Sequence, residues 1–201
     1  MEFFLGQSQA YAAWGKLYDP DDPWIEEPFS SGEKMATPLY YASLADLQRT
    51  AQALTEQGAI INAQGGIYGN ALQAASGGGY KEIVQLLLEK GADIHTQADN
   101  FGDNALQAAS GEGHKEIVPL LLEKGAKVNK QGGYYNNALQ APSAEGHYQV
   151  VQLLLKNGAE INMQGGAYGS ALRAASVRGH LQIVQLLLER RQSIDAQVVP
   201  K

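Results

Sequence analysis

One pattern of apolar and polar positions recurs five times along most of the chain. A leucine and then an isoleucine or valine return in each copy, and both are spaced 33 or 34 residues from their counterparts. The leucines are Leu39, Leu72, Leu106, Leu139 and Leu172, and the branched residues are Ile61, Ile94, Val128, Ile161 and Ile194. A period of this length indicates a repeat architecture rather than a single globular core.

Each copy predicts two short helices and a connector. A run of small, helix-favouring residues such as the ALQAAS of 71–76 is followed by a glycine break. Residues 82–90 then carry apolar side chains at helical spacing, and Gly91 is the expected left-handed stop. One such unit cannot bury its own apolar face, so it must stack on its neighbours. We therefore expect an all-α solenoid of five repeats, spanning 37–69, 70–103, 104–136, 137–169 and 170–201.

These units resemble the ankyrin repeat family. The residues that carry the resemblance are TPLYYAS at 37–43, DNFGDNAL at 99–106 and GHKEIVPLLLEKGA at 113–126. The chain departs from the family where Asn-Ala-Leu-Gln replaces Thr-Pro-Leu-His, at 70–73, 104–107 and 137–140. The sequence also resembles ankyrin arrays of filamentous fungi, which often follow a NACHT-type ATPase module in larger proteins. No GxxxxGK[ST] phosphate loop is present, so this chain contains no such module.

The first 36 residues differ from the repeats. They hold seven of the sixteen aromatic residues, and seven acidic but only two basic side chains. We predict a helix over 5–17 followed by an irregular strap. Because stacked arrays need their ends covered, the segment 1–36 is expected to cap the first repeat.

Composition removes several functional classes. The chain has 201 residues, a net charge of −6 and no cysteine. The charge argues against a nucleic-acid partner, and no apolar run is long enough to span a membrane. Without cysteine there is no disulfide or thiol nucleophile, which fits a reducing compartment, and we expect a cytoplasmic protein. No sequence feature calls for a cofactor or a metal.

Histidine and serine are the remaining candidates for chemistry. His114, His147 and His180 share one repeat position, and stacked helices lie ~8–10 Å apart, too far for these rings to share one metal. We expect them to begin the second helices and to form local hydrogen bonds. The recurring serines lack a G-x-S-x-G elbow and are interpreted as small contact residues.

The turns between repeats carry large side chains. Tyr68, Tyr135 and Tyr168 occupy a position where the family often has glycine, so we interpret them as a structural ladder. One place earlier lie Ile67, Phe101 and Tyr134, at a position that varies in the family and contacts partners. Exposed aromatic residues are enriched in binding hot spots.

The resemblance implies a protein partner bound by the concave groove and the turn tips, without catalysis. In the family, the ends of the first helices face this groove, and Glu112, Glu145 and Arg178 lie there; Asp103 and Asn136 join them as candidate contacts. One alternative is an enzyme or ligand-binding protein. Its pocket would lie between the N-terminal aromatics and a groove lined by the two glutamates with Asn70, Asn104 and Asn137. Another is an inert part of a larger receptor.

Two further features concern stability. The last repeat keeps an apolar second helix around Leu187, and Arg190-Arg191 replaces the usual glycine stop. We expect Ile194, Val198 and Val199 to fold back over it, or self-association through the C-terminal repeat. Pro119 and Pro142 fall inside expected helices, where we predict a bend or local opening.

Overall fold

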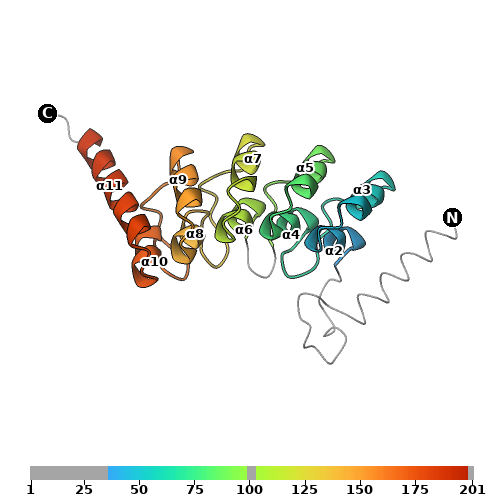
Figure 1. The fold of residues 1–201 in the computed structure, drawn as a ribbon, viewed down its shortest axis with the longest axis horizontal. Helices are drawn as coiled ribbons and strands as arrows, with labels where there is room; N and C mark the ends of the chain where they lie inside the picture. The colour runs from blue at the N-terminus through green and yellow to red at the C-terminus, as the bar shows by residue number, and fades with distance from the viewer. Residues whose placement is uncertain (1–35, 99–102, 199–201) are drawn as a thin grey trace, which may run out of the picture.

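The chain is an all-α array of stacked helix pairs, as the sequence predicts. The computed structural model describes residues 36–98 and 103–198. Within them ten helices form five consecutive pairs (Figure 1): α2 (Pro38–Leu44) with α3 (Gln48–Glu56), α4 (Ala71–Gly78) with α5 (Lys81–Glu89), α6 (Ala105–Gly111) with α7 (Ile117–Glu123), α8 (Gln140–Glu145) with α9 (Tyr148–Lys156), and α10 (Ala171–Val177) with α11 (Leu181–Val198). The predicted helix over 5–17 and most of the cap segment 1–36 lie outside the described residues.

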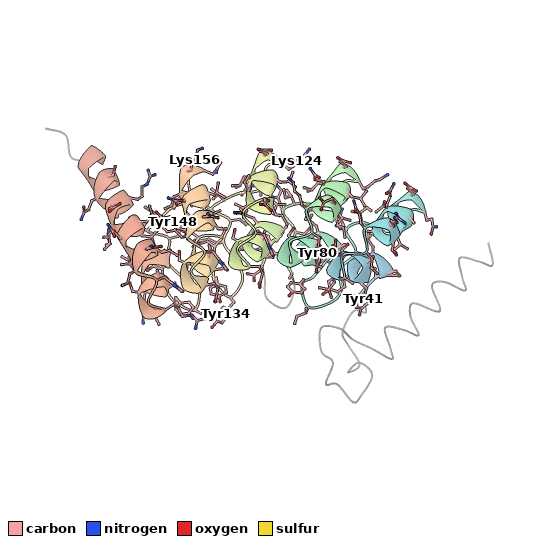
Figure 2. The ribbon with its side chains drawn as sticks, in the orientation of Figure 1. Tyr41, Tyr80, Lys124, Tyr134, Tyr148 and Lys156 are labelled. Carbon is pink, nitrogen blue, oxygen red and sulfur yellow. The ribbon has the colours of Figure 1, made fainter. Side chains whose placement is uncertain are left out.

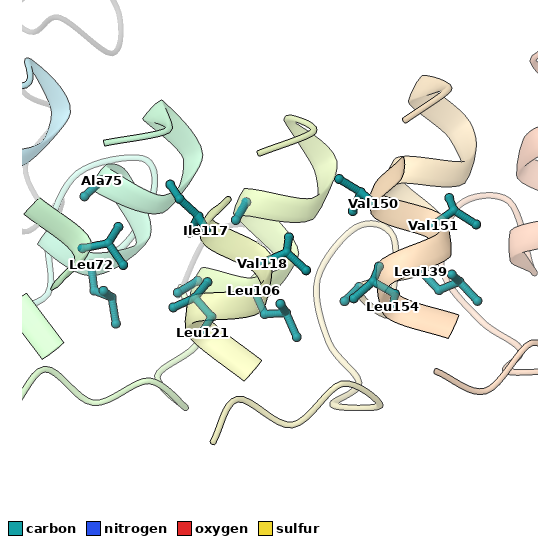
Figure 3. Close-up of a cluster of buried hydrophobic side chains, with 14 of the residues drawn as sticks. Leu72, Ala75, Leu106, Ile117, Val118, Leu121, Leu139, Val150, Val151 and Leu154 are labelled. Carbon is teal, nitrogen blue, oxygen red and sulfur yellow. The ribbon is translucent and has the colours of Figure 1, made fainter. Parts of the chain in front are cut away.

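The helices form two layers. The first helices of the pairs lie in one row, below in Figure 1, and the second helices lie in a row above them. The core runs continuously between the rows, with Leu106 of α6 and Leu139 on the first-helix side and side chains such as Leu121 of α7 on the second-helix side (Figure 3). A continuous core of this kind means that each repeat is stabilised mainly by its neighbours.

Asparagine takes over the helix-capping role at the start of the first helices. The Asn70 side chain accepts a hydrogen bond from the backbone N–H of Gln73 at 2.9 Å, and Asn104 accepts one from Gln107 at 3.0 Å. Thr37 does the same in the first repeat. Because asparagine and threonine both supply a side-chain oxygen, Asn-Ala-Leu-Gln starts a helix as well as the usual Thr-Pro-Leu-His does.

Glutamine ties three of the first helices to the inter-repeat turn that ends the same repeat. The side-chain Nε2 of Gln73 donates to the carbonyl oxygen of Asp103 at 2.7 Å. Gln107 donates in the same way to Gly132 at 3.0 Å. Gln140 repeats the bond to Gly165 at 3.2 Å. These three glutamines are buried, so the bonds fix the turns against the helices.

Asparagine also ties repeats together near the ends of the second helices. Asn62 donates to the carbonyl of Gly91 and accepts from the N–H of Asp93. Asn129 makes the equivalent pair of bonds to the fourth repeat. His95 stands at this position in the second repeat and makes no such side-chain bonds within the described residues. The junction between the second and third repeats therefore lacks one tie.

The two prolines lie in the first turns of their helices. The helix α7 begins at Ile117, whereas the equivalent α5 begins at Lys81, two residues before its own isoleucine, Ile83. Pro119 is thus the third residue of α7. Pro142 is likewise the third residue of α8, which begins at Gln140. A proline in the first turn removes a donor that has little or no partner there, so it costs less than a proline in a helix interior. The bend or local opening stays a prediction.

The C-terminal expectation also needs correction. The helix α11 continues as one helix to Val198, because no glycine stops it, so the chain does not fold back before that residue; Val199 lies outside the described residues. Leu187 is 0% exposed and belongs to the core rather than to the end face. The exposed apolar side chains of this repeat are instead Val177, Leu181 and Leu188. None of the helices in the described part is long and apolar enough to cross a membrane.

Candidate partner-binding face

The first helices and the turns between repeats form one surface, which we call the groove face. Figure 2 places Tyr134 on this side of the array, and Tyr148 and Lys156 on the second-helix side. The groove face contains a pocket of about 260 Å³ that is bounded by residues of repeats one to four. Its lining consists of Ile67, Tyr68, Gln73, Ala98, Asp103, Gln107, Ala108, Gly111, Glu112, Tyr135 and Ala141.

Small residues of the first helices leave room for this pocket. A Cβ atom on Gly77 would lie 3.3 Å from the Tyr68 ring, so the absence of a side chain at this position lets the ring lie against the end of α4. Ala108 of α6 and Ala141 of α8 line the pocket without filling it. The ALQAAS runs therefore allow close helix packing and also leave space at the surface.

Two carboxylates face the pocket. Asp103 lies at the end of a turn and is partly buried, and burial raises the pKa of its carboxyl to about 6. Its Oδ1 atom is buried and has no hydrogen-bond partner. Glu112 ends α6 and is exposed. Neither carboxylate has an ion-pair partner within the described residues.

Two of the three turn tyrosines stack on each other. The rings of Tyr135 and Tyr168 are stacked, with centroids 6.1 Å apart and planes 7° apart, and Tyr134 meets Tyr135 edge-on. Tyr68 lies against the end of α4. Tyr134 is 56% exposed, and Phe101, its predicted counterpart, lies outside the described residues.

Glu145 and Arg178 are engaged with each other rather than open. Glu145 accepts a hydrogen bond from the Tyr135 hydroxyl at 2.9 Å, and it forms an ion pair with Arg178 at 3.3 Å. The Tyr135 bond, with help from Arg178, lowers the pKa of Glu145, while burial and Glu145 raise the pKa of Tyr135. Both charged groups are exposed, so solvent screens their attraction and this pair contributes little to stability. Sequence reasoning placed both on the groove but missed their pairing.

The remaining candidates have mixed environments. Ile67 is half-buried and lines the pocket. Asn136 adopts a left-handed conformation with φ 71°. Its side chain donates to the carbonyl of Gln164 at 2.9 Å, so it joins two neighbouring turns.

The recurring histidines connect repeats instead of bonding locally. The ring of His114 donates to the carbonyl of Gly77 at 2.7 Å, and the ring of His180 donates to that of Ala144 at 2.8 Å. His147 begins α9, and its ring lies 2.6 Å from the position of a Cβ on Gly113. The expected local hydrogen bonds were therefore wrong: each ring reaches back to the preceding repeat. Within the described residues no three acidic, histidine or cysteine side chains could hold a metal.

Sequence reasoning offered a groove pocket only as an alternative, and of the lining residues named for it only Glu112 lines the pocket. Asn70, Asn104 and Asn137, proposed as groove residues, are buried helix caps and do not line it. Gln73, Gln107 and the two alanines at 108 and 141 do line it, and they were not named as site residues. Their only signal in the sequence was that the ALQAAS runs are small.

The array has capped first helices, a glycine stop after most second helices and a groove on the side of the turns. These features define a helical repeat protein. A model for ankyrin repeats, which covers three copies, matches residues 22–98 and 71–165, and the chain belongs to the ankyrin repeat family. Ankyrin repeats generally mediate protein–protein interaction, and the family is typically non-enzymatic.

The chain is also similar to a fungal protein. It is 41% identical over 102 residues to the azaphilone pigments biosynthesis cluster protein L of Monascus ruber. The matched region covers 45% of this chain and 22% of that relative. The chain therefore spans only a small part of the relative's length.

Proposed function

We propose that this chain recognises a protein partner through the groove face, without catalysing a reaction. The observation that carries the proposal is the pocket between Tyr68 and Tyr135, with the exposed ring of Tyr134 beside it. An aromatic side chain next to a pocket is the usual composition of an interface hot spot. The pocket is smaller than the ~300–1,000 Å³ of typical small-molecule sites. No histidine, serine or lysine is among the described residues that line it, which favours recognition over catalysis.

The test compares three baits in an affinity capture from the organism that makes the protein. Wild type, Tyr134→Ala and Ile60→Ala are immobilised at equal density, and bound proteins are identified by mass spectrometry. Ile60 is an exposed apolar residue that does not line the pocket, so it is the matched control. A hot-spot residue should contribute ~2 kcal/mol or more, which corresponds to a loss of about 30-fold in affinity.

The proposal requires a protein that wild type and Ile60→Ala retain and that Tyr134→Ala loses, while all three baits melt at the same temperature. Retention of every captured protein by Tyr134→Ala would contradict it. Equal loss with Ile60→Ala would show that the capture does not depend on the groove face.

We also propose that the last repeat associates with a second copy of the chain. Leu181 and Val177 in this repeat are 78% and 65% exposed. In the earlier repeats, the next repeat covers the equivalent helix pair. Soluble monomers rarely leave an apolar patch of this kind open. Sedimentation of wild type and Leu181→Glu tests this: wild type should form a dimer at high concentration and the variant should not. A monomeric wild type at all concentrations would contradict the proposal.

A further inference from the structure

We propose that the pocket on the groove face receives an arginine side chain of the partner. This inference rests on the proposed function and adds the chemistry of the residue that the pocket selects. Three properties of the lining carry it: its aromatic sides, its small apolar floor and its unpaired acceptor atoms. Each is set out below.

Tyrosines from two different turns contribute to the lining. Tyr68 comes from the first inter-repeat turn and lies against α4, and Tyr135 comes from the third. Tyr135 is held in place by its stack on Tyr168 and by its hydrogen bond to Glu145. A guanidinium group stacks well on aromatic rings, because it is planar and less strongly hydrated than an ammonium group.

The floor of the pocket suits the alkyl part of a long side chain. Ala98, Ala108, Gly111 and Ala141 supply it, and none of them carries a polar side chain. Arginine buries its three methylene groups on such surfaces while its charged head reaches polar atoms. An aliphatic residue would fill the same floor but would leave the acidic groups without a partner.

Two residues that line the pocket have an acceptor atom without a donor. The buried Oδ1 of Asp103 and Oε1 of Gln73 have no hydrogen-bond partner. Glu112 adds a second carboxylate, and the described lining contains no lysine or arginine. Unsatisfied buried acceptors cost free energy, and a guanidinium offers five N–H donors and no acceptor.

Comparison of neighbouring repeats supports this assignment. Glu112 and Glu145 occupy the same repeat position, at the end of α6 and α8. Glu145 already has a guanidinium partner, because Arg178 of the next repeat pairs with it. The residue one repeat after Glu145 is Arg178, but the residue one repeat after Glu112 is Glu145. The next repeat therefore supplies a cation to Glu145 and none to Glu112. An arginine from the partner would complete at Glu112 the pairing that the chain forms at Glu145.

The direct test is an NMR titration of the complete chain with Nα-acetyl-arginine N-methylamide. The expected result is saturable binding in the millimolar range, with the largest amide shifts at Ala108, Gly111 and Ala141. The matching citrulline derivative has nearly the same shape but no charge, and it should bind at least tenfold more weakly. The lysine derivative should also bind more weakly, because its ammonium group cannot stack or fork in the same way.

Two variants separate a local effect from general charge. Glu112→Gln should weaken binding of the arginine derivative by about three- to tenfold. Glu123→Gln removes one negative charge from the same repeat, at the end of α7 and outside the pocket, and should leave binding unchanged. Equal binding of arginine and citrulline derivatives, tighter binding of lysine, or equal weakening by both variants would each overturn the proposal.

The two proposals can fail separately. If the arginine derivative does not shift the pocket amides while Tyr134→Ala still loses its partner, the arginine assignment is wrong and protein recognition stands. If the derivative binds as expected but groove variants retain every captured protein, the pocket has its assigned chemistry and the proposed function is wrong.

Discussion

Replacing Gln107 by alanine tests how the turns are fixed to the first helices. The side chain is 3% exposed and makes two hydrogen bonds that alanine cannot make. Its Oε1 accepts from the backbone N–H of Asn104 at 2.9 Å, and its Nε2 donates to the carbonyl of Gly132 at 3.0 Å. The second bond joins α6 to the turn at the end of the same repeat, so its loss should release that turn from the helix.

The magnitude follows from those two bonds. A net loss of about 1 kcal/mol for each bond, plus the cost of leaving a buried N–H unpaired, gives about 3 kcal/mol in the free energy of unfolding. For an array of this size, 1 kcal/mol corresponds to about 2–4 °C, so the melting temperature should fall by about 6–12 °C. Histidine, which the family usually has here, can still donate to the turn, so Gln107→His should lose less.

Thermal unfolding followed by circular dichroism measures both variants. Gln149→Ala is the matched control, because this glutamine is exposed on α9 and its removal should change the melting temperature by no more than about 2 °C. A melting temperature of Gln107→Ala within 2 °C of the control would show that the glutamine bonds do not hold the array together.

Three further predictions concern glycine, pH and the N-terminal segment. Gly146→Ala places a Cβ 2.6 Å from the His180 ring, whereas Gly158→Ala meets nothing within 4 Å, and both glycines have φ near 85°. In urea unfolding, Gly146→Ala should lower the free energy of unfolding by about 1 kcal/mol more than Gly158→Ala does. Equal losses in the two variants would contradict the close approach. Because burial raises the pKa of Asp103 from 3.8 to about 6, its ionisation destabilises the folded chain, so stability should fall by at most about 3 kcal/mol as the pH rises from 4 to 7. Asp103→Asn should lack this part of the pH dependence, and identical pH profiles would refute the assignment. Deleting residues 1–36 should lower the unfolding midpoint and expose dye-binding surface if they cap the first repeat, whereas an unchanged denaturation curve would show that they do not.

The fold could be predicted because its signal is repeated. The leucine and isoleucine periods appear five times, so a weak pattern in one copy is corrected by the others. The errors arose at positions whose surroundings differ from one repeat to the next. Leu187 looked like an end-face residue because the last repeat has a neighbour on one side only, but it is fully buried in the continuous core.

The site was less predictable, because it depends on contacts between repeats. The sequence shows that Glu112 and Glu145 share a repeat position. Only the structure shows that Arg178 and Tyr135 bind the carboxylate of Glu145 and not that of Glu112. The pocket is a space that small side chains leave free between turns. A residue pattern records which side chains are small, but it does not record where their neighbours stop.

The missing tie at His95 affects how the array can curve. Its junction also lies where α5 and α7 touch less than other neighbouring second helices do, while α4 and α6 remain closely packed. The curvature of a solenoid depends on the spacing of its two layers, so it changes most easily where one layer is loosely joined and the other acts as a hinge. The pocket is lined by residues of both repeats that meet at this junction, such as Gln73 and Gln107. A partner that inserts a side chain there would therefore set the curvature of the array as well as its own position.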